Sequence, residues 1–171
     1  MKTFTQMVEK DNYPKYIIIH HFGGTDKNPL ADTSNQTFEI VRDYHISKGW
    51  ENIGYHYVIE KSGKVTQGRP DLYHGAHTIG YNHNSIGVAL AGNFDSTLPS
   101  KEQVVALTLL LKNLQTKYTV QTTDIVPHRK FANKTCYGKL LSDTWASDLV
   151  KEEDTVAIPR KLLIELSKYI I

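Results

Sequence analysis

The stretch DIVPHRKFANKTC, residues 124–136, contains the only cysteine of this 171-residue chain. His128 stands eight positions before Cys136, and Lys134 stands two positions before it. An imidazole and a thiolate carried by one loop can fill two of the four positions around a zinc ion. Two ligands do not complete a site, so a third has to come from another part of the chain.

The N-terminal region offers a candidate for that third ligand. YIIIHH, residues 16–21, is a β-branched run that is followed by Phe22 and two glycines, and such a run predicts a central buried strand. His20 and His21 end it, at the sheet edge where sites collect in open α/β folds. Because successive side chains of a strand point to opposite faces, at most one of them is expected to be a ligand. The alternative is that His20 is an ordinary buried imidazole.

Size and composition restrict the classes of protein to consider. A chain of 171 residues fits one domain, 1–171, with a proper core. The net charge of +2 is too small to indicate binding to nucleic acid or to an anionic membrane. No window approaches the length of a membrane span. The N-terminus has no continuous apolar stretch, so we expect no secretory signal peptide and synthesis in the cytoplasm. A monomer is expected.

Two helices are predicted in the first two thirds of the chain. One begins at Thr33 or Ser34, runs to about Gly49 and carries His45 as a packing or surface histidine. The other covers residues 100–118, with apolar residues at three- and four-residue steps. It begins with a serine and a glutamine in capping-box spacing.

Two more helices are predicted near the C-terminus. Ser142 is a candidate cap for a short helix that carries Trp145 and Leu149. Pro159 opens an amphipathic segment within the C-terminal extension 150–171, and we expect this segment to dock on the domain as a helix. A helix that binds a partner is the alternative.

Residues 55–60 and 65–68 predict a β-hairpin, because two strand-like runs flank a short turn that contains Ser-Gly. In its first strand, Tyr55, Tyr57 and Ile59 are expected to share one face. The Tyr55 hydroxyl could donate to a developing oxyanion. Packing of its ring with the hydroxyl at the rim is an equally good interpretation.

The remaining strands place the candidate ligands together. Residues 85–92 read as a buried strand after a polar loop at 74–84, and such loops more often carry binding than packing. A short strand at 123–126 is expected to deliver His128 to the same sheet edge as His20.

The combination of two imidazoles and one thiolate favours zinc over magnesium or calcium, which prefer oxygen ligands. Three protein ligands leave the fourth position to water, as in catalytic rather than structural zinc sites. Zinc lowers the pKa of a bound water to roughly 7, which suits attack on an amide or ester carbonyl. Lys134 or Tyr55 could then stabilise the oxyanion. No HExxH motif is present, which excludes the usual helix-borne metalloprotease site.

Four segments in order carry a resemblance to a known family: IIIHH (17–21), GWENIGYHYVIEKSGKVTQGR (49–69), GAHTIGYNHNSIGVALAG (75–92) and PHRKFANKTC (127–136). The sequence resembles the type 2 N-acetylmuramoyl-L-alanine amidases, a family that includes the peptidoglycan recognition proteins. It looks most like the small phage lysozyme-like amidases, the endolysins. The resemblance spans nearly all of residues 16–140 and leaves 150–171 outside.

The resemblance implies an α/β fold, with a central mixed β-sheet flanked by α-helices and a zinc cleft at one side. It implies that His20, His128 and Cys136 hold one Zn²⁺ per chain. Tyr55 matches the family's catalytic tyrosine, and Lys134 matches a lysine thought to stabilise the transition state.

The resemblance also implies a substrate and a reaction. His77 matches a histidine of the substrate cleft, with Asn82 and Asn84 beside it. The reaction is hydrolysis of the amide between the lactyl group of N-acetylmuramic acid and L-alanine in peptidoglycan. Its outcome is bacteriolytic, with muropeptide as substrate and the cell wall as the place of action.

Two departures from the family pattern bear on the alternatives. Tyr137 stands where the family commonly has proline, and Ala89 stands where some cell-wall recycling amidases carry glutamate. The missing glutamate favours the phage type over a recycling amidase. A non-catalytic peptidoglycan-binding recognition module is the other alternative, and such relatives typically lack the cysteine that this chain has at Cys136. The motifs do not test whether the protein has a regulatory partner.

Overall fold

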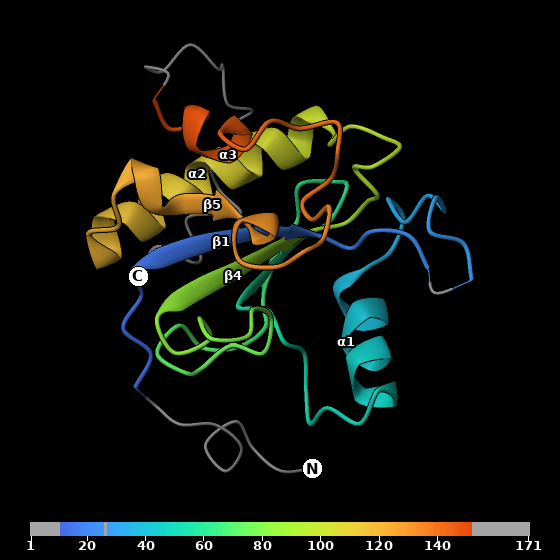
Figure 1. The fold of residues 1–171 in the computed structure, drawn as a ribbon, viewed down its shortest axis with the longest axis horizontal. Helices are drawn as coiled ribbons and strands as arrows, with labels where there is room; N and C mark the ends of the chain where they lie inside the picture. Colours follow the sequence, from blue (N-terminus) through green and yellow to red (C-terminus); the bar gives the residue numbers. More distant parts are fainter. Residues whose placement is uncertain (1–10, 26, 152–171) are drawn as a thin grey trace.

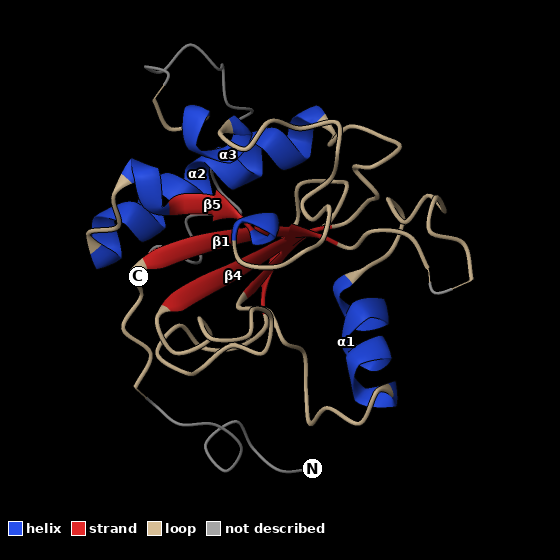
Figure 2. Ribbon diagram, in the orientation of Figure 1, coloured by secondary structure: helices blue, strands red, loops and turns tan. Residues whose placement is uncertain are grey.

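A five-stranded sheet lies at the centre of the structure, a computed structural model that describes residues 11–25 and 27–151 (Figure 1, Figure 2). The strand order is β3-β2-β4-β1-β5. β1, β2, β4 and β5 run parallel, and β3 pairs antiparallel with β2. The predicted mixed sheet and hairpin are therefore confirmed. The strands are β1 (Tyr16–His21), β2 (Tyr57–Ile59), β3 (Val65–Gln67), β4 (Ser85–Leu90) and β5 (Ile125–Pro127).

Within the part of the chain that the structure describes, three α-helices flank the sheet: α1 (Phe38–Ser47), α2 (Lys101–Tyr118) and α3 (Trp145–Asp148). α2 begins with the predicted capping box, in which Ser100 and Gln103 each accept the other's backbone N–H at 3.0 Å. These two bonds satisfy donors that the first helical turn leaves unpaired. Within the described ranges, no helix is both long and apolar enough to cross a membrane.

The face of the sheet towards α2 and α3 holds the main hydrophobic core. Alternate residues of the strands point to this face and pack on one stripe of α2. Burying each aliphatic side chain contributes roughly 1.5–3 kcal/mol. The core residues include Ile17, Ile19, Ile86, Val88 and Leu90 of the sheet and Leu107, Leu111 and Leu114 of α2.

The opposite face of the sheet is less covered. Figure 1 shows α1 on this side, away from α2 and α3. Its smaller cluster has Val41, Ile53 and Val58 as buried members, with Phe22, Phe38 and Tyr55 packed against them. Polar side chains that the strands direct to this face therefore have room for functions other than packing.

The parallel pairing of β1 with β5 settles where the ends of these strands lie. Ile19 stands opposite Pro127 in the register, so the next residues, His20 and His128, come to the same edge. A strand was predicted at 123–126. The structure instead forms a 3₁₀ turn, η2 (Thr122–Asp124), and starts β5 at Ile125. The prediction that this segment delivers His128 beside His20 is nevertheless confirmed.

Two predicted helix starts are different in the structure. α1 starts at Phe38 with Thr37 as its N-cap, because Thr33 instead donates its hydroxyl to the Gly23 carbonyl at 2.7 Å. Ser142 is not the cap of α3. Thr144 takes that position, without a side-chain cap bond. The helix predicted around Pro159 lies outside the described residues.

The prediction that Tyr55 shares one face of the sheet with Tyr57 and Ile59 was wrong. Tyr57 and Ile59 face the main core, whereas Tyr55 packs with Val58 on the opposite face. Regular β2 pairing begins only at Tyr57, so strand alternation does not extend back to residue 55. The irregular backbone before β2 turns Tyr55 towards the face that carries His20.

Candidate metal centre and cleft

Three side chains from two distant segments of the sequence meet at the carboxyl edge of β1 and β5. His20 comes from β1, His128 follows β5 at the start of the turn η3 (His128–Lys130), and Cys136 lies in the loop beyond it. One ligand atom from each lies within 4.8 Å of the other two. Cys136 Sγ is 3.8 Å from His20 Nδ1. The ring centroids of His20 and His128 are 4.5 Å apart.

This geometry fits a tetrahedral zinc ion. Bonds of about 2.0–2.3 Å to nitrogen and sulfur place neighbouring tetrahedral ligand atoms about 3.3–3.7 Å apart. The Cys136 Sγ to His20 Nδ1 distance of 3.8 Å is close to that spacing. The cluster could therefore hold a metal with little movement of its side chains.

Strand alternation explains why only one of the two adjacent histidines joins the cluster. His20 points to the less covered face of the sheet. His21 points to the other face, where its Nδ1 accepts the backbone N–H of Phe94 at 2.9 Å. His45 is also a packing residue, since its Nδ1 accepts the N–H of Gly54 at 3.1 Å.

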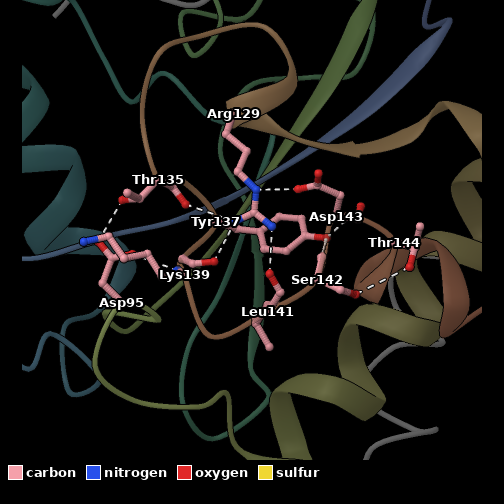
Figure 3. Close-up of polar contacts among 10 residues, drawn as sticks. Asp95, Arg129, Thr135, Tyr137, Lys139, Leu141, Ser142, Asp143 and Thr144 are labelled. Carbon is pink, nitrogen blue, oxygen red and sulfur yellow. Dashed lines mark hydrogen bonds and ion pairs between the residues drawn. The ribbon is translucent and has the colours of Figure 1, made fainter.

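The loop that carries Cys136 is held by one guanidinium group (Figure 3). Arg129 donates to the backbone carbonyls of Thr135, Gly138 and Leu141 at 3.2, 2.6 and 2.7 Å. It also pairs with the carboxylate of Asp143. A planar guanidinium with five donors can bind several acceptors at once, so the loop has a definite shape beside the metal ligands.

A second contact ties the same loop to the segment that follows β4 (Figure 3). The carboxylate of Asp95 accepts the Thr135 hydroxyl at 2.7 Å and the Lys139 N–H at 2.8 Å. Tyr137 is fully buried, and its hydroxyl donates to the Ser142 carbonyl at 2.8 Å. Tyr137 thus anchors the loop that carries Cys136 in the core.

A cleft of about 510 Å³ opens over the three candidate ligands. Tyr55 and Lys134 are among its lining residues. The ring centroid of Tyr55 lies 5.1 Å from that of His20. Lys134 is exposed to solvent, so its ammonium group can approach a bound substrate.

A larger cavity of about 950 Å³ lies on the β5 side of the same loop. Its lining includes Ile125, Phe131, Asp143 and Lys151, and Lys134 is shared with the cleft. None of the three clustered ligands lines it. The smaller cleft is therefore the candidate reaction site.

Burial sets the protonation of the candidate ligands. It lowers the pKa of His20 well below the usual value, and the neighbouring His77 and His128 lower it further. Burial and then Lys134 lower the pKa of His128 to about 4. Both imidazoles are therefore neutral at pH 7, with a lone pair to offer. Burial raises the pKa of the Cys136 thiol to about 12, so a bound cation has to displace a proton to gain the thiolate.

The residues predicted to bind substrate have different surroundings. His77 lines the cleft and lies 3.0 Å, Nδ1 to Nε2, from His20. The side-chain oxygen of Asn82 accepts the backbone N–H groups of His77 and Thr78, both at 2.9 Å. Neither Asn82 nor Asn84 is among the described residues that line the cleft. The structure thus brings one of the three predicted residues to the site.

Sequence reasoning missed three contributors to the site. Trp50 lines the cleft, and Arg129 and Asp95 hold the ligand loop. Asp95 follows β4, and its position after a parallel strand is a signal that could have identified it. Arg129 had no such signal, because its acceptors are backbone carbonyls of a loop that has no periodic pattern.

Comparison with known proteins gives consistent matches along the chain. Residues 10–139 match the family model described as N-acetylmuramoyl-L-alanine amidase. The endolysin of Enterobacteria phage T3 is 35% identical over 120 residues, covering 67% of this chain and 78% of that protein. Peptidoglycan-recognition protein SC2 of Drosophila melanogaster is 30% identical over 139 residues, covering 80% of this chain and 75% of its own.

Solved structures show the same similarity in three dimensions. The N-acetylmuramoyl-L-alanine amidase LysC from Clostridium intestinale URNW superimposes with a TM-score of 0.75 at 26% identity, covering 90% of this chain and 95% of that one. A tyrosine-to-phenylalanine mutant of Drosophila PGRP-LB in complex with tracheal cytotoxin gives a TM-score of 0.66 at 27% identity, covering 78% and 81%.

Proposed function

The chain belongs to the N-acetylmuramoyl-L-alanine amidase family, and from this premise we propose how its cleft acts. The protein is a hydrolase that cuts the amide between N-acetylmuramic acid and L-alanine in peptidoglycan, as a lytic, endolysin-like enzyme. We propose that it depends on one zinc ion, held by His20, His128 and Cys136. The meeting of these three ligands within 4.8 Å at the cleft is the observation that carries the proposal.

The donor set supports zinc in particular. Two neutral imidazoles and one thiolate suit zinc better than magnesium or calcium, and three protein ligands leave one position open. When bound, zinc supplies Lewis acidity and a water of lowered pKa. The loop contacts of Arg129 and Asp95 hold Cys136 and His128 in place while substrate enters and leaves.

Tyr55 and Lys134 are proposed to stabilise the negative charge that develops on the amide oxygen. Burial raises the pKa of Tyr55 well above its usual value, so its hydroxyl keeps its proton and can donate. Lys134 adds a positive charge at the open side of the cleft. A positioned donor of this kind is worth roughly 2.7–4 kcal/mol of transition-state stabilisation.

The partner is a muropeptide unit of the cell wall. The relative solved in complex with tracheal cytotoxin has this fold, which supports a peptidoglycan fragment as the ligand of the same cleft. We propose a monomer as the active form. Synthesis in a host cytoplasm followed by action on the wall remains our proposal for its life cycle.

The experiment measures the metal content of the purified protein and its products on purified muropeptide. We expect one zinc per chain, and new L-alanine amino termini with intact glycan. Zinc without cleavage would instead support the recognition module.

The Cys136→Ser variant tests the ligand set directly. It is expected to lose zinc and activity together, because a hydroxyl is a poor substitute for a thiolate ligand. His83→Ala, at an exposed position outside the cleft, is the control that keeps both. A metal-free Cys136→Ser protein with full activity would overturn the zinc assignment.

A further inference from the structure

His77 contacts His20, one of the three candidate zinc ligands, but is not itself one of them. Its Nδ1 is 3.0 Å from Nε2 of His20, while the other nitrogen of His20, Nδ1, faces Cys136 Sγ. We propose that His77 is a positioning residue that fixes the tautomer and ring orientation of His20 for zinc. This inference rests on the proposed function and replaces the substrate-binding role expected for His77.

A chain of hydrogen bonds determines which nitrogen of His77 carries the proton. The Tyr81 carbonyl can only accept, so the Ser85 hydroxyl donates to it, at 2.6 Å. The Ser85 oxygen can then accept from His77 Nε2–H, at 3.4 Å. This leaves a lone pair on His77 Nδ1.

The protonation of His77 in turn determines the tautomer of His20. Because His77 Nδ1 is an acceptor, the His20 proton lies on Nε2, which donates to it at 3.0 Å. His20 Nδ1 is then unprotonated and faces Cys136. Ligating histidines usually donate their second N–H to such a partner, which raises their basicity and fixes the ring.

The backbone is shaped to receive the His77 ring. A Cβ atom added at Gly87 of β4 would lie 2.5 Å from Cδ2 of His77, and one added at Gly75 would lie 2.3 Å from the same atom. Any side chain at either position would push the ring aside. The two glycines therefore allow His77 to lie against the sheet within reach of His20.

The loop around His77 holds the residue from its other side. Asn82 accepts the N–H groups of His77 and Thr78, and the Thr78 hydroxyl oxygen lies 3.0 Å from His77 Nδ1. Both ring nitrogens of His77 are thus engaged within the protein. The polar atoms that a substrate-binding histidine needs are already used.

The test compares His77→Ala with His77→Asn, whose side-chain oxygen can act as the acceptor near the former Nδ1 position. Zinc affinity is measured by competition with a chelator, and kcat and KM are measured on muropeptide. We expect His77→Ala to lower zinc affinity about 10–100-fold with KM unchanged. We expect His77→Asn to recover most of that affinity.

Gly87→Ala provides a second variant in which His77 itself is intact. It is expected to weaken zinc binding in the same direction, because the new methyl group displaces the His77 ring. His83→Asn, on the same loop and exposed, is the matched control and is expected to bind zinc as the wild type does.

The outcomes separate this inference from the proposed function. Wild-type zinc affinity in both His77→Ala and Gly87→Ala overturns the positioning role, and a raised KM alone in His77→Ala would assign His77 to substrate. Equal loss in His77→Ala and His77→Asn would also overturn it, since the acceptor would then not matter. A wild-type protein that binds no zinc overturns the proposed function itself.

Discussion

At the scale of single residues, each candidate ligand depends on neighbours that do not ligate. His20 has Cys136 near one ring nitrogen and His77 at the other. Cys136 lies between Thr135 and Tyr137, which are bonded to Asp95 and to the Ser142 carbonyl respectively. Outer contacts of this kind commonly change metal affinity by about 10–100-fold.

At Tyr55 we expect a substitution to affect catalysis without affecting zinc binding. Its ring lies beside His20, but its hydroxyl is not needed to hold the metal. We therefore expect Tyr55→Phe to retain zinc and to lower kcat about 10²–10³-fold, the loss seen when one oxyanion donor is removed. The measurements are metal content and steady-state kinetics on muropeptide.

Tyr13→Phe is a suitable comparison for this variant, because Tyr13 is 78% exposed and lies outside the cleft. It should have wild-type kinetics. A Tyr55→Phe enzyme with unchanged kcat would remove the hydroxyl from the mechanism and leave Tyr55 as a packing residue.

At the scale of elements, the parallel strands and one loop assemble the site. The register of β1 with β5 brings two imidazoles to one edge without any contact between distant helices. The third ligand has no such support from a strand. Its loop lies between η3 and α3, and Arg129 donates to three of its backbone carbonyls.

Arg129→Lys tests whether that loop needs a guanidinium. A lysine can keep one contact with Asp143, but a point charge cannot span three backbone carbonyls. With a net value of about 1 kcal/mol per hydrogen bond, we expect a loss of about 2 kcal/mol in the free energy of unfolding. We also expect weaker zinc binding. Urea denaturation and chelator competition measure the two effects.

The matched control for that substitution is Arg42→Lys on α1. Arg42 is partly exposed, and among the described residues its side chain hydrogen-bonds only to Asp43 beside it, so its replacement should change stability by less than about 0.5 kcal/mol. If Arg129→Lys were equally neutral, the loop would owe its shape to Tyr137 and Asp95.

At the scale of the whole molecule, one buried carboxylate joins elements that are far apart in sequence. Asp71 accepts hydrogen bonds from the Tyr57 hydroxyl of β2 at 2.7 Å, and from Lys117 and Tyr118 of α2 at 3.0 and 2.8 Å. Its backbone carbonyl accepts from Asn12 at 2.7 Å. The sheet, the longest described helix and the N-terminal segment are therefore tied at one point.

This network predicts how stability depends on pH. Burial alone would raise the pKa of Asp71, but hydrogen bonds from Tyr57, Lys117 and Tyr118 outweigh burial and lower it. A pKa that is lower in the folded state gives stability above the unfolded pKa, near 3.9. That stability is lost as pH falls through the folded value.

We expect Asp71→Asn to lower the free energy of unfolding by about 2 kcal/mol at pH 7. The difference in the free energy of unfolding between the variant and the wild type should become smaller as pH is lowered below about 4. Urea denaturation of both proteins from pH 7 to pH 3 measures it. Asp43→Asn, at an exposed position, is the control. A difference that stays constant over this range would contradict the linkage.

Much of the fold was predictable because local patterns specify it. The run before His20, the hairpin around its Ser-Gly turn and the capping box at Ser100 each need only a few neighbouring residues. The candidate ligands were predictable for a chemical reason, because one cysteine and a few histidines stand next to strand ends. The helix start at residue 33 or 34 was wrong, since the Thr33 hydroxyl bonds to the distant Gly23 carbonyl instead.

The sequence by itself therefore determined the family, the positions of the strands along the chain and the three candidate ligands that converge on one edge. Only the tertiary structure decided the face of the sheet on which Tyr55 packs and the hydrogen bond between His77 and His20. It also decided the hydrogen bonds from Arg129 to the loop that carries Cys136. The physical reason is that these features depend on groups from separate segments meeting with the right donor and acceptor. Hydrophobic periodicity reports which face of an element is buried, but it carries no information about which polar atoms that face will meet.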